Sequence, residues 1–462
     1  MTALDWVYAT LAQVIFVSVG YVLYSAIRGG GRERATRVFG FSAALGFGWV
    51  GFFVFYLSLV GVLPRRSLIL GMAVAAIVCA VVLHRTGRLV RVNWKWPVFR
   101  SGWAVLGAAL TILGVAFVAW DTFAWPLSDW DGILTWAFKG KALYCEGVQS
   151  SWYFSDVSKN YSHLRYPLLA PGLMAATHAA VGHLNADAAK WPMFVVHVAF
   201  LSLLYEGLRR NLESRFSLLL TGLVAATPAV YHWAGSGKAD GTLVMFTTAA
   251  LVCFAQWMNE GRGWRRLTLG SVFLACAAFS KNEGQMIAVL VVAALCAACI
   301  WLGGWKGGVQ ALAAAAIVAA LLAPFFLWAR SIPSFDEQYA SRLNWSVVTE
   351  NLDRLPVILT RFMLEPFLPA RWAATWLTLA VLLVMGRRAL REAFACLLGF
   401  VLVMQLAAYV LVHVVTPYEY RFLMEITLDR LFLHVLPAAV LLMGVAWKYA
   451  FGRFAFSGEE PR

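Results

Sequence analysis

Charged side chains are scarce in this chain of 462 residues, of which only 13% are Asp, Glu, Lys or Arg. A soluble domain carries about 25%, so an ordinary water-soluble fold is excluded. The sequence also has no P-loop, no GxGxxG after a strand, no GxSxG elbow and no HExxH pair. These absences argue against chemistry driven by ATP or a nucleotide cofactor and against the zinc-protease pattern.

Cysteine is limited to seven residues, and no pair of CxxC motifs is present. Cys296 and Cys299 form a formal CxxC on an apolar helix, where packing is the better interpretation than metal or redox chemistry. Internal repeats and low-complexity linkers are absent as well. The lack of repeated halves argues against a transporter or flippase, which usually has them.

Long apolar runs dominate instead, since 61% of the residues are hydrophobic. A run of about 17–25 apolar residues can cross a bilayer. The sequence predicts an all-α polytopic membrane protein with about thirteen spans, or twelve or fourteen because two runs are short. The spans are expected near 4–27, 38–60, 67–83, 102–120, 188–208, 216–234, 240–258, 267–280, 284–302, 308–328, 372–386, 393–414 and 430–449.

The net charge of +14 is distributed unevenly between the two sides of this membrane topology. When alternate loops are assigned to opposite sides, nearly all of the positive excess falls on one side, as the positive-inside rule requires. We therefore expect a non-cytoplasmic N-terminus and a cytoplasmic C-terminus. The basic excess indicates topology and contact with membrane lipid, and it gives no reason to expect nucleic-acid binding.

Three large loops are predicted on the outward side, near 121–187, 329–371 and 415–430. The first should contain two amphipathic helices at the membrane interface, near 131–147 and 168–182. We divide the chain into an N-terminal three-helix membrane segment (1–101), a second membrane unit (102–449) that carries these loops, and a cytoplasmic tail (450–462).

An acidic, aromatic segment opens the first outward loop and contains Asp129 and Asp131. Carboxylates next to a membrane span are costly, so they indicate a functional site. Asp131, Thr135 and Lys139 share one face of a predicted helix, and Asp129 or Ser128 can cap its start. Two neighbouring carboxylates can raise one another's pKa, which suits a general base. The alternative is a capped interfacial helix with a solvated acidic end.

Basic side chains recur at the outward ends of spans and in outward loops. Arg and Lys in such positions can hold a phosphate, although snorkelling and surface pairing are alternatives for any one of them. The set comprises Lys139, Lys141, Arg165, Lys238, Lys281, Arg421 and Arg430.

Further polar residues accompany these cations at helix ends. Local ion pairs can form between Lys238 and Asp240 and between Lys281 and Glu283. Asp429 and Arg430 open the last span with His434 one turn later, either as a helix-end salt bridge or as part of an anion site. His163 and Tyr166 flank Arg165 in the first loop and are further site candidates.

At these residues the sequence resembles bacterial GT-C superfamily glycosyltransferases, in the group of protein O-mannosyltransferases and lipid A aminoarabinose transferases. The resemblance covers about 100–440. It rests on WDGILTWAFK (130–139), RYPLLAP (165–171), KADGTL (238–243), SKNEG (280–284) and LDRLFLHVLP (428–437). In many members the acidic loop follows the first helix, whereas here it follows the fourth span, so three spans precede the corresponding helix. The Asp-Glu dipeptide of the protein-mannosylating branch is replaced by Asp-Trp-Asp.

This resemblance implies a GT-C-type bundle in a bacterial inner membrane, with the active site in the periplasm. It implies a polyprenyl-phosphate sugar donor, inversion at the anomeric carbon, and a glycan, lipid or protein as acceptor. Asp131, with Asp129 second, would be the base, and Lys139, Arg165, Lys281 and Arg430 would hold the donor phosphate. No cofactor is required by the pattern, and a divalent metal is left open.

Two other functions remain open from the sequence. An O-antigen ligase or polymerase would carry its essential acidic residue in the 329–371 loop rather than in the first loop. A non-enzymatic transporter or flippase of lipid-linked sugars would need ionisable groups or broken helices near the bilayer midplane.

Overall fold

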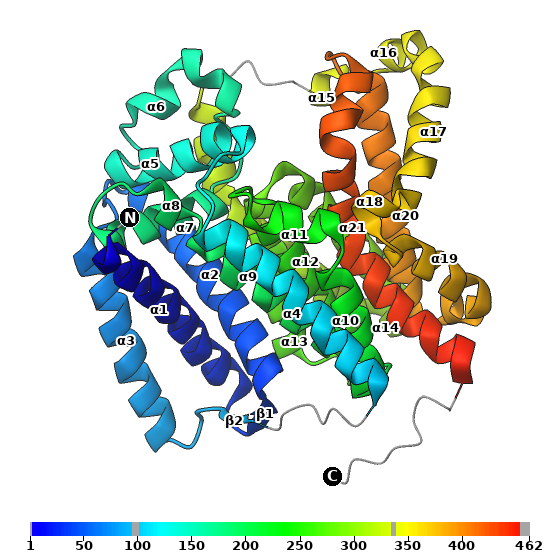
Figure 1. Ribbon diagram of the computed structural model, residues 1–462, viewed down its shortest axis with the longest axis horizontal. Helices are drawn as coiled ribbons and strands as arrows, with labels where there is room; N and C mark the ends of the chain where they lie inside the picture. The colour runs from blue at the N-terminus through cyan, green and yellow to red at the C-terminus, as the bar shows by residue number, and fades with distance from the viewer. Residues whose placement is uncertain (1, 95–100, 334–338, 453–462) are drawn as a thin grey trace.

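The computed structural model describes residues 2–94, 101–333 and 339–452, and it is almost entirely helical (Figure 1). Ten segments in these ranges are long and apolar enough to cross a membrane. They are α1 (Ala3–Arg28), α2 (Ala35–Leu59), α3 (Arg66–Arg85), α4 (Gly102–Phe123), α8 with α9 (Ala186–Leu208), α12 (Asp240–Asn259), two parts of α14 (Asn282–Ile300 and Gly304–Ser331), α20 (Ala393–Val415) and α21 (Tyr420–Phe451).

Shorter elements complete the described chain. They are β1 (Arg32–Arg34), β2 (Arg91–Asn93), η1 (Gly132–Ala137), α5 (Phe138–Cys145), α6 (Trp152–Ser155), η2 (Val157–Ser162), α7 (Leu169–Val181), α10 (Ser214–Ala225), α11 (Pro228–Gly235), α13 (Trp264–Ser280), α15 (Tyr339–Arg342), α16 (Trp345–Glu350), η3 (Leu352–Arg354), α17 (Leu355–Leu364), η4 (Glu365–Phe367), α18 (Pro369–Trp372), α19 (Thr375–Met385) and η5 (Arg387–Arg391). Taken separately, α8 is Ala186–Ala189 and α9 is Trp191–Leu208.

The predicted count of thirteen spans is not confirmed. The described residues give ten, or up to eleven if α10 and α11 form one broken span with a bend of 64°. The bend falls at Pro228, which has no N–H to continue the preceding helix and starts a new one. The expected spans at 267–280 and 372–386 correspond to α13, with 17 residues, and α19, with 11.

Local sequence explains how α1 begins and how it packs. The Thr2 hydroxyl accepts from the Asp5 N–H while the Asp5 carboxylate accepts from the Thr2 N–H, which forms a capping box. In the middle of α1, Gly20 meets α2 so closely that a Cβ there would lie 1.7 Å from the Ser42 carbonyl oxygen. Small residues at such a crossing let two membrane helices approach backbone to backbone.

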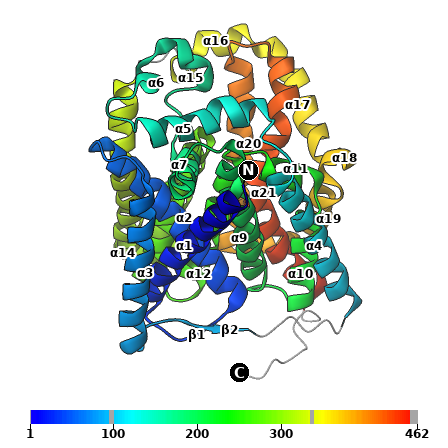
Figure 2. The same cartoon turned by 60° about the vertical axis from the view of Figure 1, so that its left-hand side comes forward.

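Different elements lie at the two ends of the molecule (Figures 1 and 2). Helices α5, α6, α15 and α16 lie at one end. The parallel pair of β1 and β2 and the C-terminal end of α21 lie at the opposite end. One continuous apolar core extends from Ala12 to Ala446 and includes residues of α1, α2 and α3, so these three helices pack into the same helical body as the rest.

Two outward loops differ from their prediction. In the first, the second helix is α7, and all of its 13 residues are buried instead of lying at an interface, because its sequence is apolar on every side. In the third, residues from Tyr420 onward already belong to α21, whose start is capped by the Glu419 carboxylate. Residues 453–462 of the predicted tail and 334–338 of the second loop lie outside the described residues.

Candidate functional site

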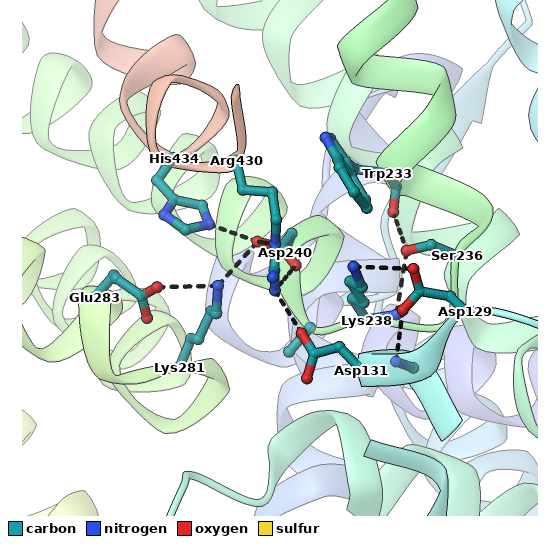
Figure 3. A network of polar contacts seen from close by, with 12 residues as sticks. Asp129, Asp131, Trp233, Ser236, Lys238, Asp240, Lys281, Glu283, Arg430 and His434 are labelled. Atoms are coloured by element: carbon teal, nitrogen blue, oxygen red, sulfur yellow. Dashed lines mark hydrogen bonds and ion pairs between the residues drawn. The ribbon is translucent and has the colours of Figure 1, made fainter. Parts of the chain in front are cut away.

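A network of ion pairs joins four segments that are distant in the sequence (Figure 3). Asp240 begins α12, Lys281 immediately precedes α14, Arg430 lies in the third turn of α21, and Asp131 immediately precedes η1. We call these four residues, with Asp129, Lys238, Glu283 and His434, the polar cluster. Six of its members lie at or just before the start of a helix, and Arg430 and His434 lie inside α21.

Asp240 is the centre of the polar cluster and is fully buried. Its carboxylate accepts from Lys281 Nζ at 3.0 Å, from Arg430 Nη2 at 3.0 Å and Nε at 3.3 Å, and from His434 Nε2 at 2.7 Å. A buried carboxylate is tolerated only when it is paired in this way. Asp240 therefore fixes the positions of two cations and one imidazole.

The tautomer of His434 follows from these contacts. A carboxylate can only accept, so His434 Nε2 carries the proton that is donated to Asp240. The other ring nitrogen, Nδ1, lies 3.2 Å from the Tyr409 hydroxyl and accepts from it in the neutral imidazole. Tyr409 on α20 thereby orients His434, which in turn supports Asp240.

Asp131 shares Arg430 with Asp240. Its Oδ2 lies 2.9 Å from Arg430 Nη2, and its side chain is 27% exposed. Burial raises the pKa of the Asp131 carboxyl, but Arg430, the Thr135 hydroxyl and Lys281 outweigh it and hold that pKa below its usual value. Asp131 is thus ionised at neutral pH and accessible, as a proton acceptor must be.

Asp129 has a different role, although it is only two residues away. Its Oδ1 accepts from the Gly132 N–H at 2.8 Å, so Asp129, one of the two caps that the sequence allowed, caps the helical segment that follows. Its Oδ2 pairs with Lys238 Nζ at 3.0 Å. Lys238 is nearly buried beside the Trp233 ring, and burial together with Arg430 lowers the pKa of its ammonium group.

The turn that follows Asp131 is not the α-helix that the sequence predicted. Gly132–Ala137 is a π-helix, in which hydrogen bonds span five residues instead of four. Lys139 follows this wider turn and is fully buried. Its Nζ donates to the Ser162 carbonyl at 2.6 Å, and the Trp136 and Tyr166 rings lie 5.6 and 5.3 Å away.

The remaining candidate site residues lie outside the polar cluster. Arg165 donates from Nε and Nη2 to the Ile332 carbonyl at 3.0 and 2.7 Å, which ties the first loop to the end of α14. His163 stacks on Tyr166 with ring centroids 4.5 Å apart. Arg421 is exposed at the start of α21 and donates to the Tyr420 hydroxyl at 3.1 Å.

The pairing of Lys238 and Asp240 expected from the sequence is replaced by pairs across the fold, whereas Lys281 and Glu283 do pair locally at 3.0 Å. Sequence reasoning noted His434 near Arg430 without giving it a role of its own, and it missed Tyr409 and Trp233. The Nε1 of Trp233 donates to Asp429 at 2.9 Å. No signal marked Tyr409, which lies inside an apolar span.

The balance of charge in the polar cluster limits what it can bind. Four carboxylates (Asp129, Asp131, Asp240 and Glu283) face three cations (Lys238, Lys281 and Arg430). To bind there, an incoming anion must therefore displace a carboxylate from one of these cations. Within the described ranges no group of three or more His, Cys, Asp or Glu side chains is arranged to hold a metal ion, so this arrangement adds no support for the divalent metal that the sequence left open.

Comparisons with known proteins agree with this architecture. The family model described as dolichyl-phosphate-mannose-protein mannosyltransferase matches residues 165–328. The crystal structure of ArnT from Cupriavidus metallidurans bound to undecaprenyl phosphate is similar, with a TM-score of 0.52 and 18% identity over 77% of this chain and 62% of that chain. The apo structure of the same protein gives a TM-score of 0.49 and 17% identity over 75% and 59%. A search of curated protein sequences finds no match.

This chain spans about three-fifths of the ArnT chain to which it is similar. The likeness shows a GT-C-type membrane fold, and the family match falls on the segment that contributes Asp240 and Lys281. The all-helical membrane fold expected from the sequence is thus confirmed, and the match over 165–328 supports the resemblance to GT-C superfamily glycosyltransferases.

Proposed function

We propose that this protein is a membrane glycosyltransferase that moves a sugar from a polyprenyl-phosphate donor to an acceptor on the periplasmic face of the bacterial inner membrane, with inversion. The match to a mannosyltransferase family and the fold shared with a protein crystallised with undecaprenyl phosphate support the donor class. The acceptor is a glycan, a lipid or a protein, and the polar cluster does not select among them.

The observation that carries this proposal is the contact between Asp131 and Arg430. It places an accessible, ionised carboxylate next to a guanidinium that is itself held by Asp240. A glycosyl transfer needs these two groups close together, one to accept the proton of the acceptor hydroxyl and one to stabilise the departing phosphate.

The reaction then proceeds as a single displacement. Asp131 accepts the proton of the acceptor hydroxyl while the hydroxyl oxygen attacks the anomeric carbon from the face opposite the phosphate. The bond between the anomeric carbon and the phosphate oxygen breaks, and the electron pair leaves with the lipid phosphate. Arg430 and Lys281 stabilise the negative charge that develops there.

Donor binding and base strength are coupled in this arrangement. Arg430 Nη2 contacts both Asp131 and Asp240, and the phosphate competes with Asp131 for the same guanidinium. Once the phosphate takes that contact, the pKa of the Asp131 carboxyl rises toward and above its ordinary value because the stabilising charge is shared. The base therefore becomes stronger only when the donor is bound.

The position of the polar cluster supports a periplasmic site. Asp131 belongs to the first outward loop, and α5 and α6 of that loop lie at the end of the molecule opposite β1, β2 and the C-terminal end of α21 (Figures 1 and 2). The positive-inside rule puts the basic end, with β1, in the cytoplasm. The acceptor would then reach Asp131 from the periplasm.

The experiment compares Asp131→Asn with Asp129→Asn in membranes supplied with radiolabelled polyprenyl-phosphate sugar. Asp131→Asn should abolish transfer while donor binding is kept or becomes tighter, because a negative charge that competes for Arg430 is removed. Asp129→Asn keeps the cap to Gly132, since Asn caps about as well as Asp, and should lose much less. Undiminished transfer by Asp131→Asn would exclude the proposed base.

The same assay separates the alternative functions. Loss of transfer on Glu365→Gln or Asp353→Asn, with Asp131→Asn active, would favour a ligase or polymerase whose acidic residue lies in the 329–371 loop. Movement of the donor across proteoliposomes without any transfer product would favour a flippase. Asp131-dependent transfer excludes both.

A further inference from the structure

A second site lies at the opposite end of the molecule from the polar cluster. A cavity of about 800 Å³ opens beside β1, between the end of α1, the start of α2, the end of α12 and the start of α13. A groove of about 700 Å³ adjoins it and continues between α1, α2, α13 and α14. Both volumes fall in the range of about 300–1,000 Å³ that is usual for ligand sites.

The cavity beside β1 is basic. Five arginines line it, namely Arg28, Arg32, Arg37, Arg265 and Arg266, against two glutamates, Glu33 and Glu260. Glu33 is shared by Arg28 and Arg37 at 2.7 and 3.4 Å, and Glu260 pairs with Arg266. Arg32 and Arg265 are exposed and make no ion pair with the part of the chain that the structure describes. The cavity therefore carries unneutralised positive charge.

The adjoining groove is apolar. Leu23 of α1, Trp49 and Phe53 of α2, Val272 of α13 and Leu321 of α14 contribute to its walls. Trp264, Arg265, Ile27 and Leu269 line both the groove and the basic cavity, so the two are continuous. Trp264 is 52% exposed at this junction, which is the position that tryptophan favours at a membrane–water interface.

We propose that this combined site binds one anionic diacyl phospholipid of the cytoplasmic leaflet. Its headgroup phosphate lies among Arg32, Arg37 and Arg265, and its acyl chains lie in the groove between α1, α2, α13 and α14. Basic pockets between membrane helices on the cytoplasmic side are suited to anionic headgroups, and the cytoplasmic leaflet supplies them. Charge complementarity selects the headgroup, and the apolar groove accepts its chains.

A polyprenyl-phosphate donor is a poorer match for this site. Its phosphate must reach Arg430 and Lys281, which lie near the opposite end of the helices, whereas the basic cavity is next to β1. The phospholipid site goes beyond the proposed transferase function, and only this exclusion of the donor lipid rests on that function. Bound lipid would hold the α1–α2 pair against α13.

Native mass spectrometry of the full-length, delipidated protein tests this proposal. The protein is titrated separately with phosphatidylglycerol, phosphatidylethanolamine and undecaprenyl phosphate. Phosphatidylglycerol should bind at one copy per chain and at least tenfold more tightly than phosphatidylethanolamine. Equal affinity for the two phospholipids, or displacement of phosphatidylglycerol by an equal concentration of undecaprenyl phosphate, would overturn the assignment.

Two variants locate the site. Arg32→Gln with Arg265→Gln should weaken phosphatidylglycerol binding about 30-fold, because each arginine near an anionic lipid contributes roughly fivefold. Thr268→Trp fills the exposed groove wall without touching the charges and should block the acyl chains. Neither change removes a packed core residue.

The matched control is Arg387→Gln with Arg388→Gln, which removes the same charge from exposed positions of η5 outside the cavity. This control should bind phosphatidylglycerol as the parent does. An equal loss in the control would show general surface attraction, and unchanged binding in Thr268→Trp would exclude the groove. Either result overturns the proposal.

Discussion

Replacing Asp240 by asparagine is expected to destabilise the protein more than any other single change in the polar cluster. The asparagine side chain has nearly the same shape but carries no charge, so Lys281 and Arg430 lose the carboxylate that they share. Breaking a buried ion pair by removing one partner typically costs about 3–5 kcal/mol. Asp240 is fully buried, so solvent screening does not reduce this value.

The cost can be measured by unfolding in mixed detergent micelles with increasing SDS. Asp240→Asn should lower the free energy of unfolding by about 4 kcal/mol. It should also reduce transfer about 100-fold, because displacement of catalytic groups by about 1 Å has this effect. The double variant Asp240→Asn with Lys281→Met should recover neither stability nor activity, because Lys281 keeps its pair with Glu283 in Asp240→Asn and its loss would leave that carboxylate unpaired.

The control is Asp156→Asn in the first loop, whose carboxylate accepts from the Ser158 N–H near the surface. This variant should unfold and react nearly as the parent does. If Asp240→Asn unfolds at the same SDS fraction as Asp156→Asn, the carboxylate does not hold the cations and the reasoning is refuted.

Three further predictions rest on individual contacts. Because the pKa of Lys238 is lowered, its ammonium group loses the proton at a lower pH than is usual for lysine. The rate of transfer should therefore fall as the pH rises through that pKa. Lys238→Arg should move this alkaline limb of the pH–rate profile to higher pH. Gly132→Ala should reduce kcat with little loss of folded protein, because a Cβ there would lie 2.5 Å from the Ser236 carbonyl oxygen and would displace the neighbouring base. Arg165→Gln should raise the rate of limited proteolysis in the first loop, because it removes both hydrogen bonds to Ile332.

Each of these three predictions can be refuted by one specific result. An alkaline limb that stays in place in Lys238→Arg would show that another group titrates there. For Gly132→Ala the matched control is Gly71→Ala, where a new Cβ meets nothing within 4 Å, and equal kcat in the two variants would contradict the steric argument. A proteolysis pattern unchanged by Arg165→Gln would mean that other contacts hold the first loop.

Composition and periodicity were sufficient to predict the membrane class and the positions of most spans, whereas the outward orientation of the first loop and its role as the site stay predictions. These properties depend on local sequence, because a span is an apolar run and its orientation follows the flanking Lys and Arg. The capping role of Asp129 could also be predicted, since a cap acts on an N–H only three residues away. The count of thirteen spans is not confirmed, because Pro228 breaks one run and because α13 and α19 are short.

The tertiary structure decided which charges meet. In the sequence Asp240 is two residues from Lys238, yet it pairs with Lys281, 41 residues away, and with Arg430, 190 residues away. Helix packing brings those cations to one buried carboxylate, and pairing between residues so far apart leaves no periodic pattern in the sequence. The basic residues were visible as a set from the sequence alone. Their division into those that hold Asp131 and Asp240 and those that tie loops together depends on packing between helices, which is why only the fold reveals it.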